Sequence, residues 1–267
     1  MRPMVLLSND DGHASRGIRT LREALAAFAD VVIVAPETEQ SATSHSLSLH
    51  RPLRTREVEP GIIAIDGTPA DCVYVALHSE RRFLPRWPDL VVSGINRGLN
   101  LGQDAFYSGT VAAAREGALR GVPAIASSAD VRADLSRVAE LTTKIAKKLY
   151  AITCGNLGPV LRSGPSLARK TPLLNLNVPL GWTGEVRRTR LGARLYEEII
   201  EFRTDPRGRE YLWLGGPGVR HERDPGSDTD AYDDDAASIT PLVLDMTSAD
   251  DEGVTDKVLA ALASNAK

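Results

Sequence analysis

Two neighbouring acidic residues, Asp10 and Asp11, follow the first apolar segment of the chain, within the sequence SNDDG. Adjacent carboxylates repel each other, and a bound divalent cation turns that repulsion into shared attraction. Oxygen ligands favour a hard ion such as Mg²⁺ or Mn²⁺ over structural zinc. Taken alone, however, Asp-Asp-Gly is good turn chemistry, and the tight turn is then the better interpretation.

Two further oxygen donors follow other apolar segments. Ser41 lies in EQSATS, and Asn96 lies in SGINRGLN. Each one singly fits an ordinary loop, since serine is common there and asparagine tolerates left-handed backbone geometry. In an open α/β sheet the carboxyl ends of the parallel strands share one edge, where ligands bind. Their shared position after strands predicts that both side chains add oxygen ligands to one cation site.

The sequence YSGTVAAAREG is a candidate phosphate site. Ser108, Gly109 and Thr110 stand directly before an alanine-rich helical segment. The free N–H groups and the positive dipole end of a helix attract phosphate, although a plain helix cap uses the same residues. The neighbouring loop GINRGLNLG matches neither GxGxxG nor the Walker pattern, and the chain contains no GxSxG elbow.

Histidine and cysteine spacing indicates no zinc or redox motif. The five histidines form no HExxH or other paired metal spacing. His13 and His45 lie near the predicted site loops, where proton transfer and a plain surface position are the two alternatives. Cys72 and Cys154 form no CxxC pair, which predicts two structural thiols in a reducing compartment rather than a disulfide.

Apolar segments alternate with helical patterns through the first two-thirds of the chain. The predicted strands are 3–7, 30–36, 61–67, 88–94, 122–128 and 172–179. The predicted helices are 18–28, 69–79 with Thr68 as its N-cap, 110–121 and 134–150. Strands that are apolar throughout, alternating with helices, indicate a parallel sheet covered on both faces. We therefore predict an α/β fold with a Rossmann-like, doubly wound, mostly parallel sheet.

The pattern changes after residue 180. Charged and aromatic residues alternate over 181–232 around the turn sequence DPRG, which predicts a C-terminal β-hairpin extension. SITPLVLDMT predicts a late strand over 238–247, and a short helix is expected after Asp251. The acidic stretch DTDAYDDDAAS is expected to be a solvated loop. The predicted division is a core at 1–180 that carries the site, a hairpin at 181–235 for oligomerisation, and a final strand and helix at 236–267.

Composition restricts the class of protein. The chain has 267 residues, of which 42% are hydrophobic, enough for a substantial core. Its formal net charge of −3 argues against a general electrostatic grip on nucleic acid. No secretory leader pattern and no apolar run of about 18 residues is present, so we expect a cytoplasmic protein without a membrane partner.

Taken together, the motifs resemble the SurE survival-protein family, whose members are metal-dependent 5′/3′-nucleotidases. The resemblance runs through most of the chain in a constant order, in LLSNDDG, APETEQSATS, IDGTPADCV, PDLVVSGINRGLNLGQDAFYSGTVAAAREGALRGVPAIA, LLNLNVP, GSDTDA and SITPL. Ala42 stands where the family usually has glycine.

The resemblance implies one divalent ion per subunit, Mg²⁺ or Mn²⁺, held by Asp10, Asp11, Ser41 and Asn96. It implies phosphate binding by Asn9, Ser108, Gly109 and Thr110. The implied catalytic residues are Asp10, Asp11 and Asn96, and the implied substrates are nucleoside 5′- and 3′-monophosphates, with short polyphosphate in some members. Family members form homodimers or homotetramers in which the hairpin is exchanged between subunits.

Two other functions fit the sequence less well. Haloacid-dehalogenase-like phosphatases need a second aspartate two positions after the nucleophile, and here position 12 is Gly12. A non-catalytic nucleotide-binding module gains nothing from paired carboxylates without a metal. The sequence therefore favours hydrolysis of a phosphate monoester by in-line attack of a metal-oriented water, with the general base left open between Asp10, Asp11 and neither.

Overall fold

A nine-stranded sheet forms the centre of the protein in this computed structural model, which describes residues 2–154, 171–196, 200–214, 219–247 and 253–264. The strands run across the sheet in the order β3 (Thr55–Glu59), β4 (Ile62–Ile65), β2 (Asp30–Pro36), β1 (Met4–Ser8), β5 (Leu90–Arg97), β6 (Ala124–Ala129), β7 (Leu173–Val178), β13 (Ala237–Pro241) and β8 (Val186–Arg188). The strands from β4 to β7 are parallel, whereas β3 and β13 run antiparallel to β4 and β7. The predicted fold class is confirmed.

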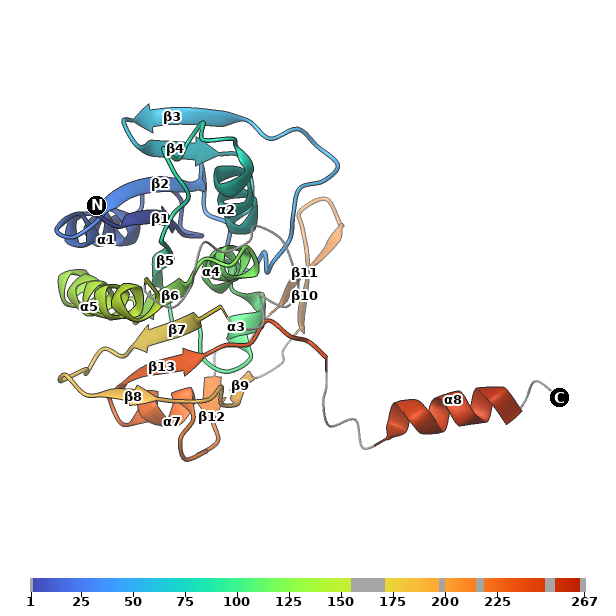
Figure 1. Ribbon diagram of the computed structural model, residues 1–267. Coiled ribbons are helices and arrows are strands. Elements are labelled where there is room, and N and C mark those ends of the chain that lie inside the picture. The colour runs from blue at the N-terminus through green and yellow to red at the C-terminus, as the bar shows by residue number, and fades with distance from the viewer. Residues whose placement is uncertain (1, 155–170, 197–199, 215–218, 248–252, 265–267) are drawn as a thin grey trace.

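Helices cover both faces of the sheet (Figure 1). Helices α1 (Arg16–Ala26) and α5 (Leu135–Thr153) pack on one face, and α2 (Pro69–His78) and α4 (Gly109–Leu119) pack on the other. Successive β1 side chains point to opposite faces, so Leu6 joins the α2 and α4 cluster while Leu7 joins the α1 and α5 cluster. Both faces are therefore dry, which explains why the central strands are apolar throughout.

The start of α2 follows the sequence prediction. The Thr68 hydroxyl accepts a hydrogen bond from the Asp71 backbone N–H at 3.1 Å, and the Asp71 carboxylate accepts one from the Thr68 N–H at 2.9 Å. Pro69 occupies the first helical position, where a missing N–H is harmless. These reciprocal bonds form a capping box that fixes the first turn of the helix.

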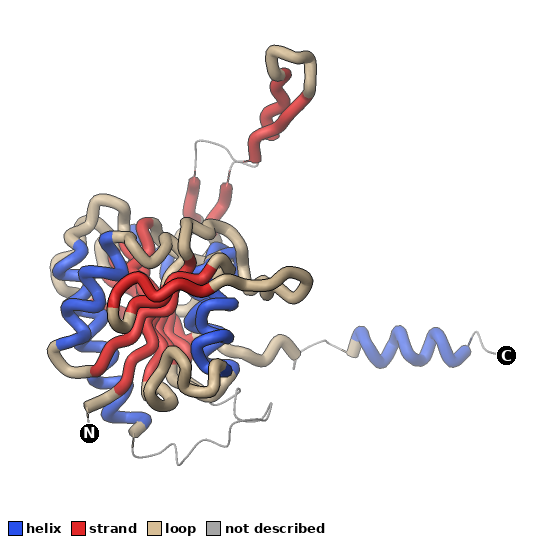
Figure 2. The backbone as a smooth tube through the Cα atoms, turned by 90° about the horizontal axis from the view of Figure 1, so that it is seen from above, coloured by secondary structure: helices blue, strands red, loops and turns tan. Residues whose placement is uncertain are grey.

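The predicted hairpin extension is present. Strands β10 (Ile200–Thr204) and β11 (Glu210–Leu214) pair antiparallel and project away from the sheet (Figure 2). The Asp205 N–H donates to the Arg209 carbonyl at 2.8 Å and closes the turn around DPRG. At the base of the hairpin, β9 (Arg194–Tyr196) pairs with β12 (Val219–His221).

One strand was missed from the sequence, and two expectations for the chain after residue 180 were wrong. The antiparallel edge strand β3 was not predicted, because its exposed sequence TREVE lacks the apolar pattern of the other strands. The late strand ends at Pro241 rather than 247, and Met246 is 98% exposed. The acidic stretch begins with helix α7 (Asp228–Asp233) instead of a solvated loop, and Asp228 is fully buried.

The C-terminal helix α8 (Val254–Ser264) lies away from the sheet in both views (Figures 1 and 2). Its side chains from Val254 to Leu262 are exposed. Among the described residues, no helix is long and apolar enough to cross a membrane. The division into three segments and the cytoplasmic location stay predictions.

Candidate metal and phosphate site

A pocket of about 580 Å³ opens at the edge of the sheet where the parallel strands β1, β2 and β5 end. This is the edge at which an open α/β sheet binds ligands. The start of α4 lies against the same pocket. The lining residues are Asp10, Asp11, Glu39, Ser41, Ala42, Asn96, Arg97, Asn100, Asp104, Tyr107, Ser108 and Tyr196.

Asp10 is the most enclosed acid of the pocket, with only 6% of the residue exposed. Thr110, in the first turn of α4, donates a hydrogen bond from its hydroxyl to Asp10 Oδ1. Gly109 lies so close that an added Cβ would be 2.8 Å from the Asp10 Cβ and 3.0 Å from Oδ2. The glycine therefore lets the helix start pack directly on the carboxylate.

Both adjacent acids bind protons more tightly than free aspartate. Burial raises the pKa of Asp10 from 3.8 to about 6, repulsion from Asp11 adds to the rise, and the Thr110 hydrogen bond opposes it. Burial also raises the pKa of Asp11, helped by Glu39, while the Arg97 backbone N–H, 3.3 Å from Oδ2, opposes the shift. A cation between these groups would relieve the desolvation and the repulsion together.

Ser41 and Asn96 reach the same pocket, as their positions after strands predicted. The Ser41 hydroxyl donates to Glu39 Oε1 at 2.7 Å. Asn96 donates from Nδ2 to the Gly98 carbonyl at 2.9 Å, which leaves its amide oxygen for a ligand. Asn96 belongs to β5 rather than to the predicted loop, because the strand continues past a register shift between Ser93 and Asn96.

That register shift includes Gly94. Its φ is +131°, and an added Cβ would lie 2.3 Å from the Ser127 carbonyl oxygen on β6. Only glycine fits such a close approach with this backbone geometry. The irregularity is typical of strands beside functional sites, where it redirects the following side chains.

The predicted phosphate residues occupy two different places. Ser108 lines the pocket, although its hydroxyl also caps α4 by accepting the Val111 N–H at 3.1 Å. Asn9 and Thr110 are fully buried and lie behind the lining. Asn9 donates from Nδ2 to the Gly12 carbonyl at 3.0 Å and to Ser15 Oγ at 2.9 Å. The Asn9 amide nitrogen is therefore engaged within the turn after β1, and a role of Asn9 in phosphate binding stays a prediction.

The donor chemistry fits a hard divalent cation. The pocket presents carboxylate oxygens from Asp10 and Asp11, the Ser41 hydroxyl and the Asn96 amide oxygen. Within the described ranges, no cluster of three or more His, Cys, Asp or Glu side chains has metal-binding geometry. An all-oxygen set that relies partly on neutral ligands fits Mg²⁺ or Mn²⁺, which keep several waters in their coordination shell.

The sequence prediction missed part of the pocket. Glu39 and Arg97 flank predicted ligands, so their neighbourhood was the available signal. Asp104, Tyr107 and Tyr196 also line the pocket. Nothing in the sequence around Tyr196, which lies in β9, points to this edge of the sheet.

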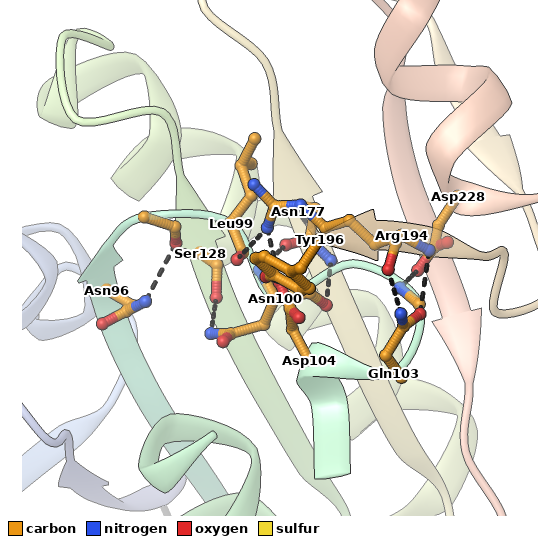
Figure 3. A network of polar contacts seen from close by, with 12 residues as sticks. Asn96, Leu99, Asn100, Gln103, Asp104, Ser128, Asn177, Arg194, Tyr196 and Asp228 are labelled. Carbon is orange, nitrogen blue, oxygen red and sulfur yellow. Dashed lines mark hydrogen bonds and ion pairs between the residues drawn. The ribbon is translucent and has the colours of Figure 1, made fainter. Parts of the chain in front are cut away.

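A polar network holds the loop between β5 and α3 (Asp104–Tyr107) against the sheet (Figure 3). The Asn100 N–H donates to Asn177 Oδ1 at 2.7 Å, and Asn100 Nδ2 donates to Ser128 Oγ at 2.7 Å. The buried Asp228 carboxylate accepts the Gly102 N–H at 3.0 Å and the Gly192 N–H at 2.8 Å. Burial raises the pKa of Asp228, and these N–H groups oppose the rise. The loop thus has a fixed shape before any ligand binds.

Neither histidine near the site lines the pocket. His13 is 9% exposed, and burial, together with Arg56 and Arg19, lowers its pKa. His45 Nε2 lies 2.9 Å from Oε2 of the buried Glu116 on α4. Cys72 is buried and Cys154 is exposed, and both are free thiols.

Comparisons with known proteins give one consistent result. A family model described as "Survival protein SurE" matches residues 5–198. A relative named "5'-nucleotidase SurE" from Sorangium cellulosum (strain So ce56) is 58% identical over 262 residues, which is 98% of each chain. A relative of the same name from Anaeromyxobacter dehalogenans (strain 2CP-C) is 48% identical over 247 residues, 91% of each chain.

A solved structure agrees with these matches. The crystal structure of the SurE protein from Aquifex aeolicus has a TM-score of 0.77 at 35% identity, and the match covers 97% of this chain and 100% of that chain. The resemblance carried by the sequence motifs is confirmed along nearly the whole length. The chain belongs to the SurE family.

Proposed function

We propose that this protein is a metal-dependent nucleotidase that releases inorganic phosphate from nucleoside 5′- and 3′-monophosphates. Two relatives whose matches cover 98% and 91% of this chain are named "5'-nucleotidase SurE". The pocket gives independent support, because it combines paired carboxylates with the start of a helix.

The observation that carries the proposal is the charge of the pocket. Asp10, Asp11, Glu39 and Asp104 line it, with Arg97 as the only lining cation that the described residues supply. A phosphate dianion next to such a set of carboxylates is strongly disfavoured by charge repulsion. A divalent cation removes the conflict, since it binds the carboxylates and the phosphate together.

Four side chains would hold the ion: Asp10, Asp11, Ser41 and Asn96. When bound, Mg²⁺ or Mn²⁺ supplies Lewis-acid stabilisation of the phosphoryl oxygens and lowers the pKa of an attacking water. Thr110 fixes the orientation of the Asp10 carboxylate. The dipole of α4 favours negative charge at its N-terminus, beside Ser108. Water then adds to phosphorus, the ester P–O bond breaks, and the nucleoside leaves as an alcohol.

A metal-dependence assay tests the proposal directly. Phosphate release is measured from AMP, GMP, 3′-AMP and short polyphosphate with Mn²⁺, with Mg²⁺ and with excess chelator. We expect hydrolysis of the monophosphates with metal and none with chelator. Undiminished turnover after complete metal removal would rule out the mechanism. Binding of AMP without turnover in every metal would instead support a regulatory nucleotide-binding module.

Asp11→Asn tests the ligand set. The change removes one anionic ligand without altering side-chain size, so we expect turnover to fall about a hundredfold or more. Asp256→Asn, on the exposed helix α8, is the matched control and should keep full activity. If Asp11→Asn keeps near-normal turnover and metal affinity, Asp11 is not a ligand of the metal.

We also propose that the protein assembles as a homodimer or homotetramer through the hairpin of β10 and β11. A two-stranded hairpin is marginally stable on its own, and this one exposes 60% of Phe202 and 60% of Trp213. Light scattering after size exclusion gives the subunit number. A monomer at all concentrations would contradict the proposal.

A further inference from the structure

The pocket also has an aromatic part of its lining. Tyr196 and Tyr107 line the same cavity as Asp10 and Asp11, and 43% of Tyr196 is exposed. The cavity of about 580 Å³ lies within the range of sites that enclose a whole small-molecule ligand. The pocket therefore has room for the organic part of a substrate beyond its phosphate.

Tyr196 is held in place by Asp104 and Arg194 (Figure 3). Its hydroxyl donates to Asp104 Oδ2 at 2.5 Å, and Arg194 forms an ion pair with the same carboxylate. The Arg194 guanidinium lies 5.6 Å from the centre of the Tyr196 ring. The ring is thus held by the guanidinium over one of its faces and by the hydrogen bond of its hydroxyl.

The segment carrying Tyr196 is also tied to the pocket through its backbone. The Arg194 N–H donates to Gln103 Oε1 at 2.8 Å, and Gln103 Nε2 donates back to the Arg194 carbonyl. Arg194 Nη1 reaches the Leu99 carbonyl at 3.3 Å. These contacts join β9 to the loop between β5 and α3, so the ring keeps one position relative to the acids.

The chemistry of the locked ring is that of a flat, neutral surface. Burial and the hydrogen bond to Asp104 raise the pKa of Tyr196 to about 12, so the phenol adds no negative charge to an acidic pocket. Asp104 Oδ2 is occupied by the tyrosine and the arginine, which leaves that atom engaged rather than available for reading a base edge. What remains for a ligand is the aromatic face opposite Arg194.

We propose that Tyr196 is the stacking platform for the nucleobase, and that it confers preference for nucleotides over phosphate esters without a base. The inference rests on the proposed function, whose phosphate end it extends. Every base has a π-face, so stacking without edge recognition accepts different bases. AMP and GMP should therefore depend on Tyr196 to a similar degree.

The experiment compares AMP with ribose 5-phosphate, which carries the same phosphate and sugar without a base. The readout is the ratio of the two kcat/KM values with Mn²⁺. We expect Tyr196→Ala to lower this ratio about tenfold to a hundredfold, the range given by loss of one base–aromatic stack. The main change should appear in the KM for AMP.

The matched control is Tyr211→Ala on β11. Tyr211 is also 43% exposed, and it is absent from the pocket lining. Its removal should leave the ratio unchanged. If Tyr196→Ala lowers kcat/KM for AMP and for ribose 5-phosphate by the same factor, the residue has a positioning role only and the proposal is wrong. An unchanged ratio in Tyr196→Ala also overturns it.

A binding measurement separates this inference from the proposed function. Calorimetry with AMP and with ribose 5-phosphate in the presence of Mn²⁺ compares the same variants without requiring turnover. If the wild-type protein hydrolyses nothing, the proposed function fails, while a selective loss of AMP affinity in Tyr196→Ala still supports the platform. If hydrolysis occurs but AMP and ribose 5-phosphate bind all variants alike, only the platform fails.

Discussion

The Thr110 hydroxyl donates a hydrogen bond to Asp10 Oδ1, although the two residues are 100 positions apart in the sequence. Thr110 lies in the first turn of α4, and Asp10 follows β1. The predicted phosphate turn and the predicted metal carboxylate are therefore one connected structure. Any group bound to Asp10 is positioned by the first turn of this helix.

Thr110→Val tests that connection. The change keeps the side-chain shape but removes the donor, so Asp10 loses its orientation and its pKa rises further. Loss of a partner that orients a metal ligand weakens metal binding about 10–100-fold, and calorimetry with Mn²⁺ measures this. Thr142→Val is the control, because Thr142 is equally buried and bonds Ser127 Oγ at 2.8 Å, away from the pocket. Equal effects of both variants on metal affinity would contradict the prediction.

The stability of the metal-free protein should depend on pH through Asp10. Its pKa is about 6 in the folded state and near 3.8 in the unfolded chain, so folding favours the protonated form. This contribution is fully present below pH 3.8 and is lost as pH rises from there through about 6, with a size of about 3 kcal/mol. Thermal unfolding in chelator should show Tm falling between about pH 4 and pH 6. Mn²⁺ should restore Tm at the higher pH, and Asp10→Asn should flatten the profile.

Gly109→Ala should damage the site more than the fold. Its Cβ would push against Asp10, at 2.8 Å from the Asp10 Cβ, and we expect Mn²⁺ affinity to fall about tenfold. Gly117→Ala in the same helix meets Val91 Cγ2 at 2.5 Å in the core. That variant should lose about 1–3 kcal/mol of stability through overpacking while keeping its metal affinity. Comparing Tm with Mn²⁺ titrations for the pair separates the two effects, and a reversed pattern would contradict this assignment.

His45 should act by holding the Ser41 loop. It contacts the buried Glu116 on α4, and Ser44 in the same loop donates from its N–H to the Tyr107 carbonyl at 3.0 Å. His45→Ala leaves a buried carboxylate with fewer partners, so we expect a loss of about 1–3 kcal/mol in stability. The KM for AMP should rise more than kcat falls. His50→Ala, at an exposed position of the same loop, should change neither.

Much of this arrangement could be predicted from the sequence because the residues that end each strand are visible as a change from apolar to polar residues or as a proline. Apolar β1 stops at polar Asn9 and Asp10, and β2 stops at Pro36 before the loop that carries Ser41. Parallel topology then places these loops at one edge. The start of α2 could also be predicted, because Thr68 is a good N-cap residue and Pro69 suits the first helical position.

Side-chain direction and distant contacts escaped prediction for physical reasons. Motif spacing located Asn9 after β1 and Thr110 at the start of α4. Their hydrogen-bond partners, Gly12 and Ser15 for Asn9 and Asp10 for Thr110, hold both side chains behind the pocket lining. Ala42 has a φ of 56°, a conformation in which glycine is favoured, so the family's usual glycine at this position has a backbone cause.

Contacts between remote segments were also invisible in the sequence. Tyr196 bonds Asp104 across 92 positions, a pairing that no local pattern encodes. Asp228 was expected in solvent because acidic runs are usually hydrated, yet two backbone N–H groups satisfy its carboxylate in the interior.

Asp228 also affects the order in which the protein can fold during translation. Its carboxylate holds Gly102 from 126 positions away, and β13, which follows it, inserts between β7 and β8. Most of the chain must therefore leave the ribosome before the loop between β5 and α3 is fixed at Gly102, whereas its anchor at Asn100 needs only Ser128 and Asn177. The parallel half of the sheet can begin to assemble during translation, whereas a closed pocket comes only when synthesis is nearly finished. A product truncated before Asp228 would keep Asp10 and Asp11 after β1 but would lack the contact that fixes the loop at Gly102.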